Sequence, residues 1–506
     1  MTLAAVDRYD PNAVERVGNR AIVLGASIAG LCAARVLADA FDEVVVVERD
    51  SLPEEPTPRA GAPQSGHPHA LLAAGQATLE DLFTGFGEAL VSAGGLVVDV
   101  SRHLVEYQQG DFLASGTERS PSYCASRPLI EHVVRSRVRD LDVVRIHEEC
   151  RFVDYRTTAD GSTVTGVVVR ERDGPTKPMG GALVVDATGR TSRTPEWLDS
   201  NGFTAPPEDS VGVNVQYSSL RLDRPAGDRR LVSVPANAPR TRGAVLIPIE
   251  DGQWDVILVG MHGDGGPTDR DGAFEFADHL PVDLVGDLLR ARPWVSDTVQ
   301  RYPFPASLRR RYEALDRFPE GLLVTGDAIS SFNPVYGQGM SVAALDALVL
   351  HHALAAGGLD RLGPRFFDRV SPTLDTPWRM ATGADYQFSE TSASPSLGTT
   401  VFNWYFERLL RAAHDDGDVA SAYGEVVGLE TSPTRLLRPG VLARVFLPIG
   451  GDSESLDPSM TDAVPSTEGA AAPEADPSSP RHSAAERSAV ADDEPAAERE
   501  RTHRPT

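Results

Sequence analysis

The sequence predicts an α/β fold in which a parallel sheet is interrupted by an antiparallel sheet, and three observations support this prediction. The segment from Ala21 to Glu48 has the pattern of a strand, an Ala-rich helix and a second strand. Residues 205 to 262 alternate apolar and polar side chains, as in an antiparallel sheet. A buried strand from Gly321 to Thr325, followed by a long helical pattern, then resumes the parallel architecture.

Length and composition limit the class of protein. The 506 residues suggest two or three domains or subdomains, and an apolar fraction of 41% allows a sizeable core. A net charge of −25 argues against nucleic-acid binding, which requires clustered Lys and Arg. Cys32, Cys124 and Cys150 show no CxxC spacing, so we expect no disulfide framework or zinc site and a reducing cytoplasm. The N-terminus has no apolar signal core and no run of 18 apolar residues occurs, so we expect no stable membrane insertion.

The first half of the chain has the pattern of mixed helices and strands. Helices are predicted over 29–40, 69–94 and 127–141. Strands are predicted over 21–27, 43–48, 142–148, 152–155, 163–170 and 183–186, with a hairpin turn at Asp160-Gly161. The N-terminal elements therefore form a βαβ unit, and the later ones include a hairpin.

The second half is predicted to be mainly helical after the antiparallel sheet. Helices are expected over 339–356, 361–391 and 401–413, and a basic, apolar segment from Arg435 to Pro448 is expected to dock as a last helix rather than lie on a membrane. From residue 451 the chain has 13 acidic and 5 basic side chains and no aromatic residue, so it should be disordered. The predicted divisions are 18–200 together with 301–360 (one discontinuous α/β domain), 201–300 (antiparallel sheet), 361–450 (helices) and 451–506 (tail).

The first motif runs from Gly25 to Gly30 and joins the first strand to the first helix. Small residues here let the backbone approach a pyrophosphate, which the N-terminus of the helix then faces with free N–H groups. Ser27 replaces the usual middle glycine. The second strand ends at Glu48, where a carboxylate can accept hydrogen bonds from the hydroxyls of an adenosine ribose and disfavours a 2′-phosphate. Together these features predict a dinucleotide site.

Two later motifs indicate which dinucleotide is bound. Asp186-Ala-Thr-Gly-Arg190 follows a buried strand, and Gly326-Asp327-Ala328 precedes Asn333-Pro-Val-Tyr-Gly-Gln-Gly-Met340 at a helix start. With these motifs the chain resembles the FAD-dependent monooxygenases of the para-hydroxybenzoate hydroxylase fold over residues 19–358. The resemblance implies a Rossmann-like FAD-binding domain in which Asp327 accepts from the ribityl hydroxyls. It also implies that the helix start faces the N1–C2=O edge of the flavin, where reduced flavin is negative.

Further matches complete the predicted site. Ser126-Arg127-Pro128 opens a helix where this family often places an arginine on the FAD ribose or pyrophosphate. The segment Arg59 to Gln64, with His67 and His69, resembles the loop beside the flavin; no third ligand accompanies the histidines, so no metal is expected. The predicted cofactor-binding residues are Gly25, Ser27, Ile28, Ala29, Gly30, Glu48, Arg49, Arg59, Arg127, Asp186, Gly189, Gly326, Asp327, Pro334, Gly337, Gly339 and Met340.

Three sequence segments look most like those of bacterial secondary-metabolite monooxygenases, especially polyether-pathway epoxidases. They are GAPQSGHPHALL, CASRPLI and FNPVYGQGMSVAALDA. This resemblance implies reduction of FAD by NAD(P)H, directly or through a separate flavin reductase. Dioxygen then adds at flavin C4a, and the hydroperoxide transfers one oxygen atom to an organic substrate, most simply an alkene. The protein positions the substrate and excludes water, so no catalytic side chain is assigned.

Four other functions are alternatives to epoxidation. An aromatic-ring hydroxylase is the main alternative, although phenols usually need a base and none is evident. A prenyl reductase of related fold would reduce alkenes without oxygen. A halogenase needs a catalytic lysine and a WxWxIP signature, but the single lysine, Lys177, lies in a Gly/Pro-rich turn and the signature is absent. A non-catalytic flavoprotein that recruits a partner through its tail would not need intact flavin motifs.

The substrate is expected against the sheet from Val211 to Met261. Gln216, Tyr217 and Trp254 are candidate lining residues by type, with core packing the simpler role for Trp254. The run Arg309-Arg310-Arg311 is interpreted as a solvated helix face, or alternatively as an attractor for an anionic substrate group.

Overall fold

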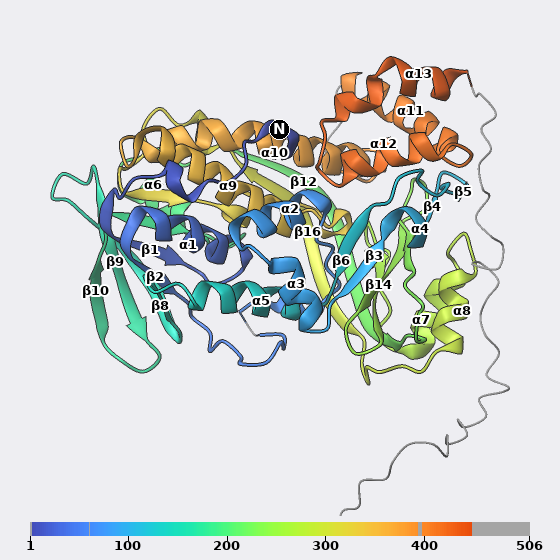
Figure 1. The fold of residues 1–506 in the computed structure, drawn as a ribbon, viewed down its shortest axis with the longest axis horizontal. Coiled ribbons are helices and arrows are strands. Elements are labelled where there is room, and N and C mark those ends of the chain that lie inside the picture. The colour runs from blue at the N-terminus through green and yellow to red at the C-terminus, as the bar shows by residue number, and fades with distance from the viewer. Residues whose placement is uncertain (1–2, 60, 393–396, 448–506) are drawn as a thin grey trace, which may run out of the picture. The chain divides into compact units, whose positions relative to one another are not determined.

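A five-stranded parallel sheet organises the first part of the chain in the computed structural model (Figure 1). The structure describes residues 3–59, 61–392 and 397–447, so the predicted disordered tail lies outside the described residues. The strand order is β17-β11-β1-β2-β7, and every neighbouring pair is parallel. The strands are β1 (Gly18–Leu24), β2 (Phe41–Val47), β7 (Val144–His147), β11 (Leu183–Asp186) and β17 (Leu322–Val324). The predicted α/β class and its strands are confirmed.

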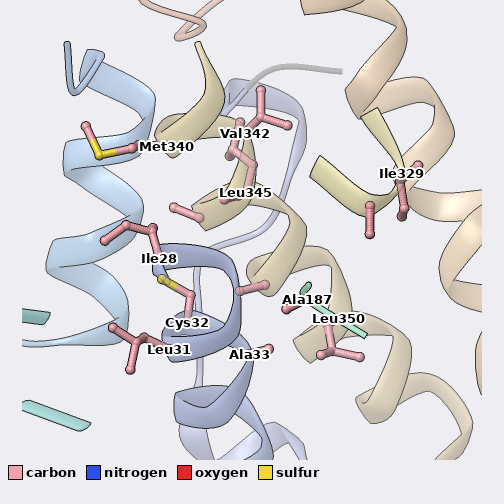
Figure 2. Packing of buried hydrophobic residues seen from close by; sticks show 14 of the residues in the cluster. Ile28, Leu31, Cys32, Ala33, Ala187, Ile329, Met340, Val342, Leu345 and Leu350 are labelled. Carbon is pink, nitrogen blue, oxygen red and sulfur yellow. The ribbon is translucent and has the colours of Figure 1, made fainter. Parts of the chain in front are cut away.

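One face of this sheet is covered by helices. Alternate residues of β1, Ala21 and Val23, join the main core with α1 (Ile28–Ala40), α5 (Arg127–Arg139) and α9 (Gly339–Gly357). Figure 2 shows Ile28, Leu31 and Cys32 of α1 beside Met340 and Leu345 of α9. These three helices match the sequence predictions closely. Helix α9 is the one described helix long and apolar enough to cross a membrane, but 78% of that stretch is buried in the protein.

The other face of the parallel sheet packs on a small antiparallel sheet. Ile22 and Leu24 contact the apolar side chains of this second sheet, which has the order β10-β9-β8. Its strands are β8 (Cys150–Thr157), β9 (Val164–Glu171) and β10 (Thr176–Gly180). The placement of Lys177 in a turn is wrong, because Lys177 lies on edge strand β10 and pairs there with Val169. An edge strand accepts a proline such as Pro178 because it needs fewer N–H donors.

The predicted antiparallel sheet forms, and it extends beyond the 201–300 span expected from the sequence. Its order is β18-β16-β12-β15-β14-β13-β4-β5, in which only the pairing of β13 with β4 is parallel. Strands β4 (Leu104–Gln108), β5 (Asp111–Phe112), β16 (Gln300–Arg310) and β18 (Ser330–Ser331) lie outside that span. The strands inside it are β12 (Glu208–Asp223), β13 (Leu231–Val234), β14 (Arg242–Ile249) and β15 (Gln253–Gly260).

The two faces of the eight-stranded sheet have different neighbours. Leu220, Trp254 and Val256 pack with α7 (Arg270–Ala277) and α8 (Leu284–Ala291). Tyr217 and Val259 instead join the core that contains α1 and α9. Because side chains alternate along a strand, Gln216 lies on the α7 side, where Ser218 donates to the Pro267 carbonyl. Of the three candidate lining residues, only Tyr217 is on the cofactor side; Trp254 is a core residue.

The stretch 69–94, predicted as one helix, is two helices. Helix α2 (Ala73–Leu82) ends before Gly85, whose φ of +77° is left-handed, and α3 (Phe86–Ser92) begins directly after it. A left-handed residue cannot continue an α-helix, and glycine adopts this conformation without steric cost. The remaining elements of this part are β3 (Leu96–Asp99) paired with β6 (Pro121–Cys124), α4 (Val100–His103) and α6 (Thr194–Ser200).

The C-terminal region is helical, as predicted. It comprises α10 (Leu362–Asp385), α11 (Leu397–Ala412), α12 (Gly417–Val427) and α13 (Pro439–Phe446). Helix α12 was not predicted. The last helix packs against α11 and α12 through Val445 and Tyr405, and the Tyr405 hydroxyl donates to the Leu436 carbonyl. Docking of the final segment is therefore confirmed.

Both interpretations of the arginine run are wrong. Arg309 and Arg310 end strand β16, and Arg311 directly follows it, so the run is not a helix face. Arg309 is fully buried; its Nη1 donates to Asp375 Oδ1 at 2.6 Å and its Nη2 to the Ser371 carbonyl at 3.2 Å. Arg310 donates to the carbonyls of Ala328 and Arg190. These guanidinium groups join strand β16 to α10 and to the loops of the parallel sheet.

Replacing Arg309 with alanine should lower the free energy of unfolding by about 3 kcal/mol, because it removes a buried cation that is hydrogen-bonded to Ser371 and Asp375 of α10. The matched change Arg311→Ala, at a partly exposed side chain, should cost about 1 kcal/mol or less. Urea denaturation measures both. Equal losses for the two variants would show that the burial of Arg309 adds nothing to its contribution to the free energy of unfolding.

Candidate functional site

The turn between β1 and α1 is shaped to receive an anion. Gly25 has a φ of +103°, which favours glycine. A Cβ on Gly30 would lie 1.9 Å from the Gly25 carbonyl oxygen, so glycine is required for this close approach of strand and helix. Because Ile28, Ala29 and Gly30 form the first turn of α1, their N–H groups have no partner within the helix. These donors and the helix dipole can bind a phosphate.

The carboxylate of Glu48 lies at the end of β2, beside this turn. It is buried; Oε2 accepts from the Ala26 N–H at 2.8 Å and Oε1 from the Asp50 N–H at 3.0 Å. Nη1 of Arg59 approaches Glu48 Oε2 at 3.3 Å. Glu48 is therefore oriented by the backbone of the phosphate turn, as a ribose-binding carboxylate requires.

A buried ion cluster holds the two predicted arginines. Arg127 donates to Ser27 Oγ at 2.8 Å and to Glu131 Oε2 at 3.3 Å, and Arg59 Nε donates to Glu131 Oε1 at 2.8 Å. Burial opposes ionisation of Glu131, but Arg127 and Arg59 outweigh it and hold the pKa of Glu131 below its usual value. Glu131 was not predicted, although its position four residues after Arg127 on a helix is a signal for such a pair.

A cavity of about 570 Å³ opens beyond Glu48. It is lined by Arg49, Asp50, Ser51, Pro53, Pro58, Arg59, Glu149, Arg151 and Arg172. Arg49 is exposed there and donates to the Gly61 carbonyl at 3.0 Å. The cavity adjoins the end of β2, because Arg49 and Asp50 directly follow Glu48 and Arg59 approaches Glu48, so it can accommodate the adenosine end of a dinucleotide.

The second motif shapes a turn at the end of β11. Asp186 is buried and accepts from the hydroxyls of Thr188, Ser192 and Thr194. Its oxygens are thus committed to the turn, which favours a supporting role for Asp186. Gly189, with a φ of +81°, and Arg190 are only partly buried and border the site.

The third motif places Asp327 opposite the arginines. Gly326 has a φ of +64°, and a Cβ on it would lie 2.7 Å from Ala29 Cβ, so the turn after β17 lies directly against the start of α1. Asp327 is exposed, yet the surrounding protein raises its pKa, and Arg127 and Arg190 oppose the rise. Asp327, Arg127 and Arg190, from three separate motifs, are therefore close enough to interact electrostatically.

Asp346 of α9 supports this turn from within the core. Its Oδ2 accepts from the Gly326 N–H at 3.1 Å, and burial raises the pKa of Asp346 to about 7. A carboxyl group with a pKa of about 7 is partly protonated at neutral pH, so it can hold the turn with less than a full negative charge beneath Asp327. Asp346 was not among the predicted site residues, because it lies within an otherwise apolar helix.

The loop before α9 is held by buried polar side chains. Pro334 is exposed and begins a short 3-10 turn, Pro334–Tyr336, and Gly337 follows with a φ of +65°. Gly339 begins α9 and is exposed, with no protein atom within 4 Å of an added Cβ, while Met340 is buried in the core. Open space thus lies beside Gly339 in the first turn of α9, whose N–H groups have no partner within the helix, and both features suit the predicted contact with the flavin edge.

The cofactor-side face of the eight-stranded sheet carries one notable polar pair. His67 is buried, and its Nδ1 lies 2.6 Å from Ser219 Oγ on β12. Its ring contacts Tyr302 of β16, with 5.5 Å between the ring centroids. Burial lowers the pKa of His67 to about 4, so the imidazole is neutral at physiological pH. His69 instead bonds the His67 carbonyl, which shapes the loop.

The residues present fit FAD. The phosphate turn with Arg127 and Arg59 suits the pyrophosphate, and Glu48 with the cavity beyond it suits the adenosine. Asp327 suits the ribityl chain, and the open space at Gly339 leaves room for the flavin edge. A dinucleotide site of this kind, beside a second sheet with an apolar face, defines the protein as a flavoprotein.

Comparison with known proteins identifies the family. The model of the FAD binding domain matches residues 19–358, so the chain belongs to this family. Protein Rv3254 of Mycobacterium tuberculosis is 34% identical over 428 residues, covering 79% of this chain and 88% of that protein. Kynurenine 3-monooxygenase of Salinispora tropica is 25% identical over 368 residues, covering 68% and 74%. The chain is an FAD-dependent monooxygenase of the para-hydroxybenzoate hydroxylase fold.

Solved structures support the fold. The flavin-dependent brominase Bmp2 superposes with a TM-score of 0.58 at 14% identity, covering 84% of this chain and 98% of that chain. At this identity the likeness concerns the fold alone.

Replacing Gly339 with alanine should weaken FAD binding at least tenfold, equivalent to about 1.4 kcal/mol, without destabilising the protein. The added methyl group meets no protein atom but enters the space next to the first turn of α9. Fluorescence titration of the apoprotein with FAD measures the affinity, and thermal unfolding of the apoprotein measures stability. Gly424→Ala, at a helical glycine that also has open space around it, is the matched control. Unchanged FAD affinity in Gly339→Ala would show that FAD does not bind against the first turn of α9.

Proposed function

We propose that this monooxygenase transfers one oxygen atom to a carbon–carbon double bond of an apolar secondary metabolite. The observation that supports this choice is the surface next to the cofactor site. Around Tyr217 on the eight-stranded sheet, the side chains that join the main core are Ile257, Val259 and Phe304. Such a face can bind hydrocarbon by burial of apolar area, and its nearest described cation at this point is the Arg190 guanidinium, 5.0 Å from the Phe304 ring centroid.

The cofactor supplies the oxidising chemistry when bound: FAD reduced by NAD(P)H activates dioxygen. The protein holds the cofactor through the groups described above and orients the substrate against β12, β15 and β16. Neutral His67 can donate or accept one hydrogen bond to a polar group of the substrate. We propose that the electrons come from NAD(P)H directly or through a separate flavin reductase.

Aromatic-ring hydroxylation is the second candidate, and the His67–Ser219 pair favours it. Hydroxylation of a phenol is helped by a base that takes the phenolic proton. A neutral imidazole whose Nδ1 is hydrogen-bonded to Ser219 leaves Nε2 to face a phenol. Burial lowers the pKa of His67 to about 4, so it acts as a base only if the bound substrate raises that pKa. Halogenation has no such support, because Lys177 is on edge strand β10 and ion-paired with Glu171 at 3.2 Å.

Rapid mixing of the reduced, FAD-loaded protein with dioxygen tests the oxygen chemistry. We expect a transient with a single near-ultraviolet absorbance band before the spectrum of oxidised flavin returns, because the proposed oxygen transfer requires an oxygen adduct of the reduced cofactor that outlives mixing. Stopped-flow absorbance measures it, and free reduced FAD is the control. Direct return of the oxidised spectrum, with candidate substrates present, would favour a reductase. Failure to bind FAD would contradict the whole assignment.

Product analysis separates the two candidate reactions. We expect alkene-containing polyketides to gain one oxygen from labelled dioxygen with His67→Gln retaining most of the turnover, since epoxidation needs no base. For a phenolic substrate, the same variant should lose about 10²-fold or more in kcat, as removal of a general base does. Mass spectrometry and a pH profile of kcat measure both outcomes. Oxygen transfer to phenols only would contradict epoxidation.

A further inference from the structure

Asp385 is a buried carboxylate that the site described above does not use. It is the last residue of α10 and is fully buried. Its Oδ1 accepts from Asn333 Nδ2 at 3.0 Å and from the Tyr336 hydroxyl at 2.9 Å. Its Oδ2 is buried and has no hydrogen-bond partner among the described residues. One oxygen is thus bound twice, and the other is free to take a proton.

The groups that face Asp385 are uncharged at neutral pH. They are Tyr217 from β12, Tyr336 from the loop before α9, and Tyr386, which follows Asp385 in the chain. No Arg, Lys or His side chain pairs with Asp385 in the part of the chain that the structure describes. Burial therefore raises the pKa of Asp385 to about 6, against the lowering effect of the bonds from Asn333 and Tyr336.

The same carboxylate anchors the loop that leads to the flavin edge. Asn333 Oδ1 accepts from the Tyr217 hydroxyl at 2.8 Å, and that hydroxyl accepts from the Val335 N–H at 2.9 Å. The Asn333 N–H donates to Ser307 Oγ at 3.0 Å. Asp385 is consequently bonded to both ends of the segment 333–336, which immediately precedes Gly337 and the first turn of α9.

We propose that Asp385 is a positioning residue that couples uptake of one proton by the protein interior to reduction of the bound flavin. The inference rests on the proposed cofactor site. Two electrons and a proton from a nicotinamide or another two-electron reductant leave one net negative charge on the reduced isoalloxazine. In the same step the Asp385 carboxylate takes one proton from solvent and becomes a carboxylic acid, and no other bond changes.

The physical cause is repulsion across the anchored loop. Asp385 is buried and no cationic side chain pairs with it among the described residues, so its negative charge is poorly screened and, when ionised, it disfavours a second negative charge on the reduced flavin. Reduction in turn raises the pKa of Asp385. Above about pH 6, where Asp385 is ionised in the oxidised protein, a proton must therefore be taken up; below that pH it is already present. Protonation also weakens Asp385 as an acceptor for Asn333 and Tyr336, so the loop responds to the redox state.

The test measures the midpoint potential of bound FAD as a function of pH. The wild-type protein should show a steeper fall of potential with rising pH above about pH 6 than below it. Asp385→Asn keeps the size of the side chain and should lose the steeper segment, so that its potential exceeds the wild-type value above this pH and matches it below. Asp368→Asn, at an exposed carboxylate on the same helix, should behave as wild type.

A second variant decides the matter if Asp385→Asn does not fold. Tyr336→Phe removes one bond that lowers the pKa of Asp385, so the onset of the steeper segment should move to higher pH. An onset that stays in place, or an identical pH slope in wild type and Asp385→Asn, overturns the proposal. A purely structural role would shift the potential equally at every pH. Failure to bind FAD would instead refute the cofactor site, which separates the two claims.

Discussion

The parallel register of the central sheet is the constraint on which the site depends. Val47, Leu24, Asp186 and Val324 are neighbours in one row across β2, β1, β11 and β17. The residues after this row are Glu48, Gly25, the Ala187–Arg190 turn and, after Thr325, Gly326-Asp327. Because parallel strands all end at the same edge, segments more than 130 residues apart meet in one place. A one-residue shift in any of these strands would remove a motif from the site.

Charge balance then determines how the site can remain stable before the cofactor binds. The chain is strongly acidic, yet Arg59 and Arg127 lie buried at the phosphate turn. Isolated buried cations are costly, and Glu131 offsets that cost by pairing with both and with Arg135. The same carboxylate fixes the guanidinium groups near Ser27. Glu131 thus weakens the attraction of the arginines for a phosphate, because it partly neutralises them. It also preorganises them, so they need not be reoriented on binding.

Local patterns predicted the elements near the cofactor but not the contacts that tertiary folding creates. The strand–turn–helix at Gly25 and the helix start at Gly339 are encoded by residues adjacent in sequence, so they could be read directly. Arg309 could not, because a charged residue in a run reveals nothing of Asp375 and Ser371 on a helix 60 residues later. Strands β4 and β16 join the eight-stranded sheet from outside residues 201–300, and no local pattern indicates such a long-range pairing. The helix break at Gly85 could have been predicted, since a glycine between two helical patterns often ends a helix.

The substrate sheet, the flavin-edge loop and α10 form one hydrogen-bonded unit rather than three independent parts. Tyr217 of β12, Asn333 of the loop and Asp385 of α10 are linked in series, and none of them is exposed. A buried polar chain of this kind has few alternative partners, so a change at one end is transmitted to the other. The side chain of Tyr217 lies on the face where the substrate is expected, whereas Asn333 precedes the first turn of α9. The face proposed for the substrate and the loop proposed for the flavin edge are therefore linked through the same few bonds, and the helix that closes this unit belongs to the region C-terminal to the family's own domain.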